Sequence, residues 1–297
     1  PPIHIRGNKV INLVSVRGCP YPCTFCAVAA INGTKFRKVS IERFVDNIEL
    51  YTRKGYDSFI IYDDTFTLDK KRAVAISKEI LKRKLKIFWN CWSRVDCVDD
   101  NTLSYMKEAG CYLITYGCES MNPKTLDKLK KGYGVEQNIE GIEITKRNGL
   151  LASSSFMIGL PGETREDILN TISKVNSTEL DLAFFPVFEP YKGTPIYDDC
   201  VTEGRWMVDE RYSNRLLVDQ KEVWVPNTLA RKEIEKLSRK AFKSFYLRPY
   251  TLFNLPKVLS KLPFARKIRF ISSALDYFLW SNLRRTPPNQ IGSKFKS

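Results

Sequence analysis

The chain has 297 residues, of which 43% are apolar, so it can bury a large core and is neither disordered nor fibrous. Its formal net charge is +15, but sixteen of its Lys and Arg residues lie between Ala230 and Ser297, against three acidic residues. The first 229 residues are therefore nearly neutral. A basic end on a neutral body favours an anionic partner: a phospholipid surface, an acidic substrate or, less strongly, a nucleic acid.

The apolar runs and the cysteines indicate the compartment. No run reaches the roughly 20 apolar residues that a spanning helix needs, and no signal-peptide segment opens the chain. Three of the eight cysteines lie within eight residues and the others are scattered, which is not a disulfide framework. We therefore expect a cytoplasmic protein, with peripheral membrane contact as the variant that the basic end suggests.

Apolar, β-rich segments alternate with helical segments over the first 195 residues, which is typical of βα units around a parallel sheet. Strands are expected at residues 10–16, 58–63, 86–94, 112–119, 151–159 and 181–189. Ser40, Asp69, Asp99 and Asn122 are suited to cap the helices between them. The fold class predicted is α/β, a partial TIM-like (β/α)6 barrel with its chemistry at the carboxyl ends of the strands.

The alternation stops near Pro195, so we predict two domains: residues 1–195 form the barrel and residues 196–297 a connecting segment with a helical, basic C-terminal extension. The connecting segment shows no clear period except for a short strand at 222–225. Helices are expected at 229–247 and at 264–283. Breaks are expected at Pro249, Pro256 and Pro263.

The second of these helices has one apolar face. Its members recur at steps of four and three: Phe264, Ile268, Ile271, Leu275 and Phe278. Such a face is typical of core packing. If it is exposed, the neighbouring Arg266, Lys267 and Arg269 would suit an anionic membrane surface.

The strongest motif follows the first predicted strand, where Cys19, Cys23 and Cys26 lie in a loop rich in Gly and Pro. Three soft thiolates this close can hold one iron–sulfur cluster. A four-iron cluster needs four ligands, so one iron would stay open to a small molecule. A structural zinc ion would need a fourth ligand nearby, but the single histidine is His4 and the next cysteine is Cys91.

The spacing Cys-x3-Cys-x2-Cys, with Phe25 before the last Cys, resembles the motif of the radical S-adenosylmethionine (SAM) enzymes. The resemblance implies that Cys19, Cys23 and Cys26 bind a [4Fe-4S] cluster and that Phe25 lies beside bound SAM. The open iron would bind the amino and carboxylate groups of SAM. Reduction would then release a 5′-deoxyadenosyl radical that abstracts hydrogen from a substrate.

The resemblance extends to the ends of the second and third predicted strands. Asp63 and Asp64 stand where the family commonly has Gly-Gly-Glu, and either carboxylate could bind the SAM ammonium group. Ser93 and Arg94 match polar residues that face the SAM ribose or carboxylate. A plainer interpretation is that the two aspartates only terminate a strand.

Two further motifs resemble the family at the fourth and fifth strands. Gly117-Cys118-Glu119-Ser120 is similar to Gly-x-Glu-Ser, which implies that Glu119 binds the ribose hydroxyls. Gly159, Leu160 and Pro161 begin a turn similar to the one beside the adenine. Alternatively, Glu119 pairs with Arg94 and the turn is an ordinary helix start.

The sub-pattern resembles the cobalamin-associated branch, which includes the anaerobic Mg-protoporphyrin cyclase and its methyltransferase relatives. Supporting segments are 63–66, 93–96, 190–195 and 245–249. Enzymes of that branch carry a cobalamin domain before the cysteines, whereas here nine residues precede the first predicted strand and the chain starts at Pro1. If that domain was removed, methyl transfer from cobalamin or a cyclisation is expected; if it was lost, SAM cleavage remains.

Two rivals stay open at this point. The basic end favours a tRNA-modifying methylthiotransferase, and the cysteines alone would also suit a non-catalytic iron–sulfur electron carrier or sensor. Electrons are expected from a reductant such as flavodoxin or ferredoxin. The substrate is not identified. Trp92, Tyr116, Glu189 and Tyr191 are candidates to line its pocket, depending on strand register.

Overall fold

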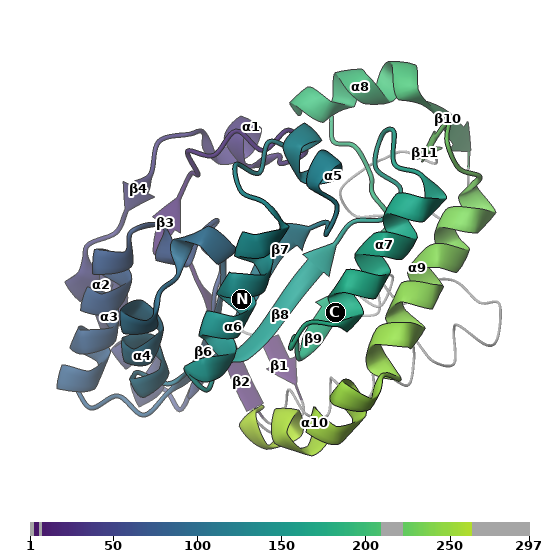
Figure 1. Cartoon of the computed structure of the whole chain (residues 1–297). Coiled ribbons are helices and arrows are strands. Elements are labelled where there is room, and N and C mark those ends of the chain that lie inside the picture. Colours follow the sequence, from purple (N-terminus) through teal and green to yellow (C-terminus); the bar gives the residue numbers. More distant parts are fainter. Residues whose placement is uncertain (1–2, 6–7, 209–221, 263–297) are drawn as a thin grey trace.

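The fold is seen in a computed structural model that describes residues 3–5, 8–208 and 222–262 (Figure 1). In this part of the chain, one sheet has the order β1 (Ile3–Ile5), β2 (Asn8–Leu13), β5 (Ser58–Ile61), β6 (Phe88–Ser93), β7 (Cys111–Glu119), β8 (Leu151–Phe156) and β9 (Leu182–Phe184). Strand β1 is antiparallel to β2, and the other six strands are parallel neighbours in chain order. The predicted six-unit partial barrel is confirmed.

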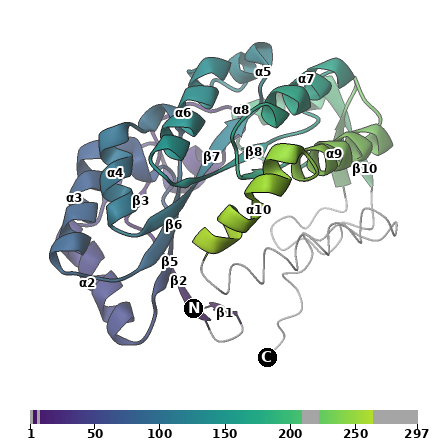
Figure 2. The same ribbon diagram turned by 60° about the horizontal axis from the view of Figure 1, so that its bottom comes forward.

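Helices cover one face of this sheet (Figures 1 and 2). They are α2 (Ile41–Arg53), α3 (Lys70–Lys82), α4 (Asp100–Glu108), α5 (Pro123–Lys128), α6 (Val135–Arg147) and α7 (Arg165–Asn176). The short helix α1 (Val28–Asn32) buries no residue and directly follows the cysteines. The four predicted caps are confirmed, since Ser40, Asp69, Asp99 and Asn122 each accept a backbone N–H of the first turn. Single 3-10 turns, η1 (Phe66–Leu68) and η2 (Val95–Cys97), follow β5 and β6.

Strand side chains alternate between the helix-covered face and the opposite face, called the inner face below. Cys91, Ile114 and Tyr116 are buried in the main core with the helices. Leu151 and Leu182 instead form a second cluster with residues of a C-terminal helix. The alternation therefore determines whether a strand side chain faces the helices or the inner face.

The C-terminal part begins with elements that the sequence did not indicate. Helix α8 (Pro195–Glu203) and strand β10 (Gly204–Val208) occupy the segment without a clear period, and β10 pairs with β11 (Glu222–Pro226), the predicted short strand. Helix α8 is short and starts on a proline, so its nine residues carry too few turns for a visible period.

Helix α9 (Arg231–Tyr246) confirms the predicted helix at 229–247, and α10 (Pro249–Lys261) follows it. The predicted break at Pro256 is wrong, because α10 continues through this residue. Val258 and Leu262, at the end of this helix, pack against the inner face. This packing offsets the helical hydrogen bond that proline cannot make. The predicted helix at 264–283 and the break at Pro263 lie outside the described residues.

Arg248, between α9 and α10, ties the C-terminal part to the barrel. Its guanidinium donates to the carbonyls of Val175, Asn176, Thr178 and Leu180 at 2.6–3.0 Å, which satisfies the end of α7. Burial lowers the pKa of Arg248 to about 10. Side chains of α9 also join the main core, and the domain boundary at residues 195/196 stays a prediction. No helix among the described residues is long and apolar enough to cross a membrane.

Candidate functional site

The cysteine loop leaves the sheet after β2 and is closed by a small ribbon, in which β3 (Val16–Arg17) pairs with β4 (Arg37–Lys38). Gly18 precedes the first cysteine with φ 92°, and a Cβ there would lie 2.1 Å from the Lys35 carbonyl oxygen. Only glycine fits this close approach. The loop is therefore fixed where it starts.

Two carboxylates from the end of β5 hold the same loop. Asp63 is buried and accepts the Ser15 N–H at 2.6 Å, the Val16 N–H at 3.0 Å and the Ser15 hydroxyl at 2.5 Å. Asp64 accepts the Gly18 N–H at 2.8 Å. Burial raises the pKa of Asp63, and the bonds from Ser15 and Val16 oppose this rise. The aspartates thus anchor both ends of the turn into the cysteines, and their contact with SAM stays a prediction.

Cys19, Cys23 and Cys26 are half-buried, whereas the other five cysteines are fully buried. Burial raises the pKa of the Cys26 thiol; Cys23 and Cys19 add to this rise, while the Val28 N–H and a nearby lysine oppose it. The three thiols thus lie within electrostatic reach of one another. Within the described ranges, no three His, Cys, Asp or Glu side chains converge closely enough to hold a metal ion.

Arg94, at the end of β6, contacts the loop directly. Its Nη1 lies 3.6 Å from Cys23 Sγ, Nε and Nη2 bind both Asp96 oxygens at 3.0 and 2.9 Å, and Nη2 also donates to the Lys131 carbonyl at 2.6 Å. The guanidinium carbon lies 3.5 Å from the ring centre of Tyr21 and 4.8 Å from that of Tyr133. Arg94 is 5% exposed, and these contacts hold its guanidinium charge beside Cys23.

Lys131 brings a second buried cation to this region. Its ammonium lies 5.6 Å from the ring centre of Phe25 and 3.9 Å from Glu119 Oε1. Glu119 ends β7 with φ 65°, a left-handed conformation that a non-glycine residue adopts at a cost and that is common at functional sites. The partner of Glu119 is therefore Lys131, rather than the Arg94 that the plainer interpretation named.

The remaining predicted contacts lie on neighbouring strand ends. The Ser93 hydroxyl pairs with the Thr67 hydroxyl. In the turn after β8, the Glu163 carboxylate folds back and accepts the N–H groups of Gly159 at 2.7 Å and Leu160 at 3.1 Å. Leu160 and Pro161 are buried, and α8 and β11 pack over this turn. Roles for these residues in SAM binding stay predictions.

Glu163 makes the turn sensitive to pH. Burial raises its pKa to about 7, against the bonds from Leu160 and Gly159, and its buried Oε1 has no hydrogen-bond partner among the described residues. The folded protein thus binds the carboxyl proton of Glu163 more tightly than the unfolded chain does. Protonation of Glu163 therefore stabilises the fold fully below pH 4.5, and this stabilisation is lost as the pH rises through 7. The loss amounts to roughly 3 kcal/mol.

Glu163→Gln keeps an acceptor for the turn but cannot ionise. We expect the unfolding free energy of the variant, relative to that of the wild type, to rise by roughly 3 kcal/mol between pH 4.5 and pH 8 in urea titrations. Glu166→Gln, at an exposed position in the first turn of α7, should track the wild type. A variant-to-wild-type difference that stays flat with pH would contradict this assignment.

The inner face next to the site carries a pair of aromatic rings. Trp92 stacks on Tyr62 with ring centres 4.5 Å apart and an interplanar angle of 24°, and Tyr62 is 49% exposed. Tyr116 is buried on the helix side, where its hydroxyl bonds the Thr145 hydroxyl at 2.6 Å. Trp92 therefore faces the barrel interior, and Tyr116 does not line a pocket there.

Comparison with known proteins identifies the family. The sequence profile of the Radical SAM superfamily matches residues 13–175, more than half of the chain. The chain belongs to the radical SAM superfamily. An uncharacterized methyltransferase of Pyrococcus horikoshii is 35% identical over 81% of this chain and 52% of its own length. An anaerobic magnesium-protoporphyrin IX monomethyl ester cyclase of Rubrivivax gelatinosus is 23% identical over 95% and 50%, respectively.

Solved structures agree on the fold. TsrM, a radical SAM methyltransferase from Kitasatospora setae, superposes with a TM-score of 0.67 at 16% identity, covering 82% of this chain and 53% of its own. These similarities are consistent with the cobalamin-associated branch. The chain spans about half the length of the curated relatives it matches.

Membership implies SAM and a [4Fe-4S] cluster, and the site residues fit both. Cys19, Cys23 and Cys26 are half-buried thiols of one loop, and the buried cations Arg94 and Lys131 would offset the negative charge of a thiolate-bound cluster. Because the superfamily consists of enzymes, the chain is a radical SAM enzyme of uncertain reaction type. Membership also argues against a non-catalytic electron carrier.

Sequence reasoning missed several residues around the thiols. Tyr21, Lys131 and Tyr133 enclose Arg94 and Phe25, yet a single Tyr or Lys in a loop carries no pattern. The only signal was position, since Lys131 and Tyr133 follow the β7 strand end after the short helix α5.

Proposed function

We propose that this chain cleaves SAM reductively at a [4Fe-4S] cluster held by Cys19, Cys23 and Cys26. The observation that supports the proposal most is that three half-buried thiols share one loop at the carboxyl ends of parallel strands, with the buried Arg94 guanidinium 3.6 Å from Cys23 Sγ. When bound, the cluster and SAM would supply a 5′-deoxyadenosyl radical that takes hydrogen from a substrate.

The chain's own residues would bind and orient the cluster and SAM and would shield them from water. Asp63 and Asp64 hold the cysteine loop in place, and Arg94 holds positive charge beside Cys23. Glu119 presents a buried carboxylate for the ribose hydroxyls, and the turn stabilised by Glu163 closes the adenine side. Burial of this turn under α8 and β11 would help to exclude water from a reactive site.

The proposed reaction outcome is methyl transfer or cyclisation, as the curated relatives suggest. The stacked and partly exposed Tyr62 and Trp92 favour a substrate with an apolar surface. Methyl transfer through cobalamin would need a cobalamin-binding domain beyond this chain. A one-electron donor such as flavodoxin or ferredoxin would reduce the cluster.

The test is anaerobic reconstitution of the full chain. We expect about four irons per chain and, with dithionite and SAM, formation of 5′-deoxyadenosine detected by mass spectrometry. Addition of SAM should also change the electron paramagnetic resonance (EPR) spectrum of the reduced cluster. Tight binding of one zinc ion in place of iron, or a cluster spectrum that ignores SAM, would refute the proposal.

A further inference from the structure

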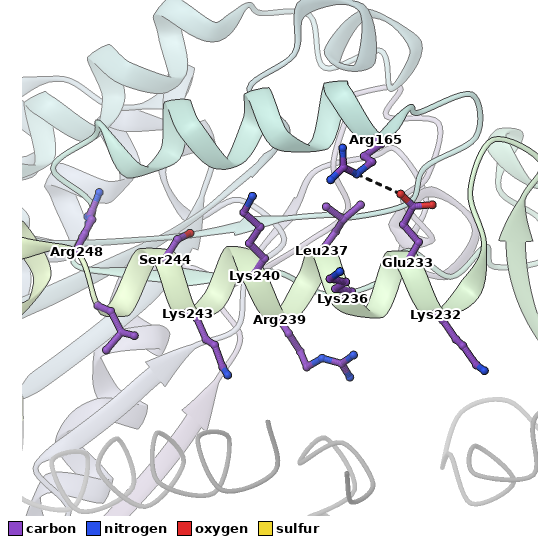
Figure 3. Close-up of a pocket in the computed structure, with 11 residues that line it drawn as sticks. Arg165, Lys232, Glu233, Lys236, Leu237, Arg239, Lys240, Lys243, Ser244 and Arg248 are labelled. Atoms are coloured by element: carbon purple, nitrogen blue, oxygen red, sulfur yellow. Dashed lines mark ion pairs between the residues drawn. The ribbon is translucent and has the colours of Figure 1, made fainter. Parts of the chain in front are cut away.

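A groove of about 1150 Å³ runs along α9 beside α7 and is lined mainly by cations (Figure 3). Two of them are engaged in the fold: Arg248 satisfies the end of α7, and Arg165 pairs with Glu233 at 3.3 Å. Among the described residues that line the groove, Glu233 is the only acid. The groove is therefore strongly positive, although the body of the protein is nearly neutral.

The basic residues form a stripe along one face of α9. Lys232, Lys236, Arg239 and Lys243 follow one another at steps of four, three and four, which places them on the same side of a helix. Lys232, Arg239 and Lys243 project away from α7 (Figure 3). Lys232, Lys236 and Lys243 make no ion pair with any residue of the described ranges. Lysines that form no ion pair within the described part of the chain are available to an external anion.

Exposed apolar side chains lie at the end of α9 and in the first turns of α10. Leu247, one helical step beyond Lys243, lines the groove and is 57% exposed. Leu252 and Phe253 in the first turns of α10 are 52% and 84% exposed, and no other large apolar side chain in the described part of the chain is as exposed as Phe253. Leu252 and Phe253 are adjacent in the chain, and neighbouring exposed apolar side chains can form part of an interaction surface.

We propose that the α9 stripe and the exposed turn of α10 dock onto an anionic lipid surface. Unpaired lysines would meet lipid phosphates and carboxylates, while Leu247, Leu252 and Phe253 would enter the boundary with the acyl chains. A nucleic acid would also meet the lysines, but its bases stack on aromatic rings, and two of these three side chains are aliphatic. The combination of charge with aliphatic exposure therefore favours the bilayer.

The test is flotation of the full chain with vesicles of phosphatidylglycerol and phosphatidylcholine, and with vesicles of phosphatidylcholine alone. We expect binding only to the anionic vesicles, weakening with salt. Since each basic residue near an anionic leaflet contributes about fivefold to partitioning, Lys232→Gln with Lys236→Gln should reduce it roughly 25-fold. Phe253→Ser should reduce it about tenfold or more.

A matched control keeps the result specific. Lys78→Gln with Lys82→Gln removes the same charge at the same spacing from α3, on the other side of the barrel, and should float like the wild type (Figure 1). Far-ultraviolet circular dichroism verifies that all variants fold. The proposal is overturned if both vesicle types bind equally, if the two double variants lose binding alike, or if the chain ignores vesicles and binds a 30-residue polyuridine instead.

Discussion

Cys23→Ala is expected to abolish both the cluster and SAM cleavage in anaerobically reconstituted protein. Loss of a residue that only contacts a metal ligand lowers metal affinity or activity roughly ten- to a hundredfold. Loss of a ligand itself should therefore lower them more than a hundredfold. Cys23 is the most informative of the three thiols because it alone is in contact with Arg94, at 3.6 Å. Iron and sulfide analysis and the yield of 5′-deoxyadenosine measure the effect.

A buried cysteine provides the control for this experiment. Cys111→Ala removes a thiol that is 1% exposed and contacts the Leu113 carbonyl in the helix-side core. This variant should lose some stability, of order 1 kcal/mol, but keep its iron and its SAM cleavage. If Cys23→Ala retained iron while Cys111→Ala lost it, the assignment of the cluster loop would be wrong.

Much of the fold could be predicted because its determinants are local. The alternation of β-rich and helical segments fixed six parallel strands, and the caps Ser40, Asp69 and Asp99 marked the helix starts. Helix α8 and strand β10 escaped prediction because they are short. The break predicted at Pro256 was wrong because the prediction considered only the missing proline N–H. It could not include the tertiary contacts of Val258 and Leu262.

The site could be predicted in its positions but not in its contacts. Asp63, Asp64 and Arg94 all lie where the strand ends converge, as expected from a parallel sheet. Their partners depend on side-chain direction and on distant loops, which sequence does not specify. Asp63 is bonded to Ser15, 48 residues earlier, and Arg94 to the Lys131 carbonyl, 37 residues later. Such long-range contacts carry no local pattern.

The position of Arg94 has a consequence for electron transfer. A thiolate-bound cluster becomes more negative on reduction, and a fixed cation beside Cys23 would stabilise the reduced form. Burial opposes the charge of Arg94, but Asp96, Tyr133 and Cys23 together outweigh burial and keep the pKa of Arg94 above its usual value. We therefore expect Arg94→Gln to lower the midpoint potential of the cluster, and also to lower iron retention roughly ten- to a hundredfold.

Two further variants separate charge from shape. Arg94→Lys keeps the charge but cannot reach Asp96, the Lys131 carbonyl and Cys23 at once, so its midpoint should lie between those of the wild type and Arg94→Gln. Asp96→Asn removes a negative charge and should move the midpoint upward, opposite to Arg94→Gln. An EPR-monitored redox titration measures all of them, with the exposed Arg147→Gln as the unshifted reference.

Opposite signs at Arg94 and Asp96 would establish an electrostatic role, because simple loosening of the loop cannot raise the potential in one variant and lower it in the other. A purely structural Arg94 would give fewer clusters per chain, but those that form would titrate at the wild-type midpoint in every variant. That outcome would leave the cysteine assignment intact. It would limit Arg94 to holding Tyr21, Tyr133 and the loop together.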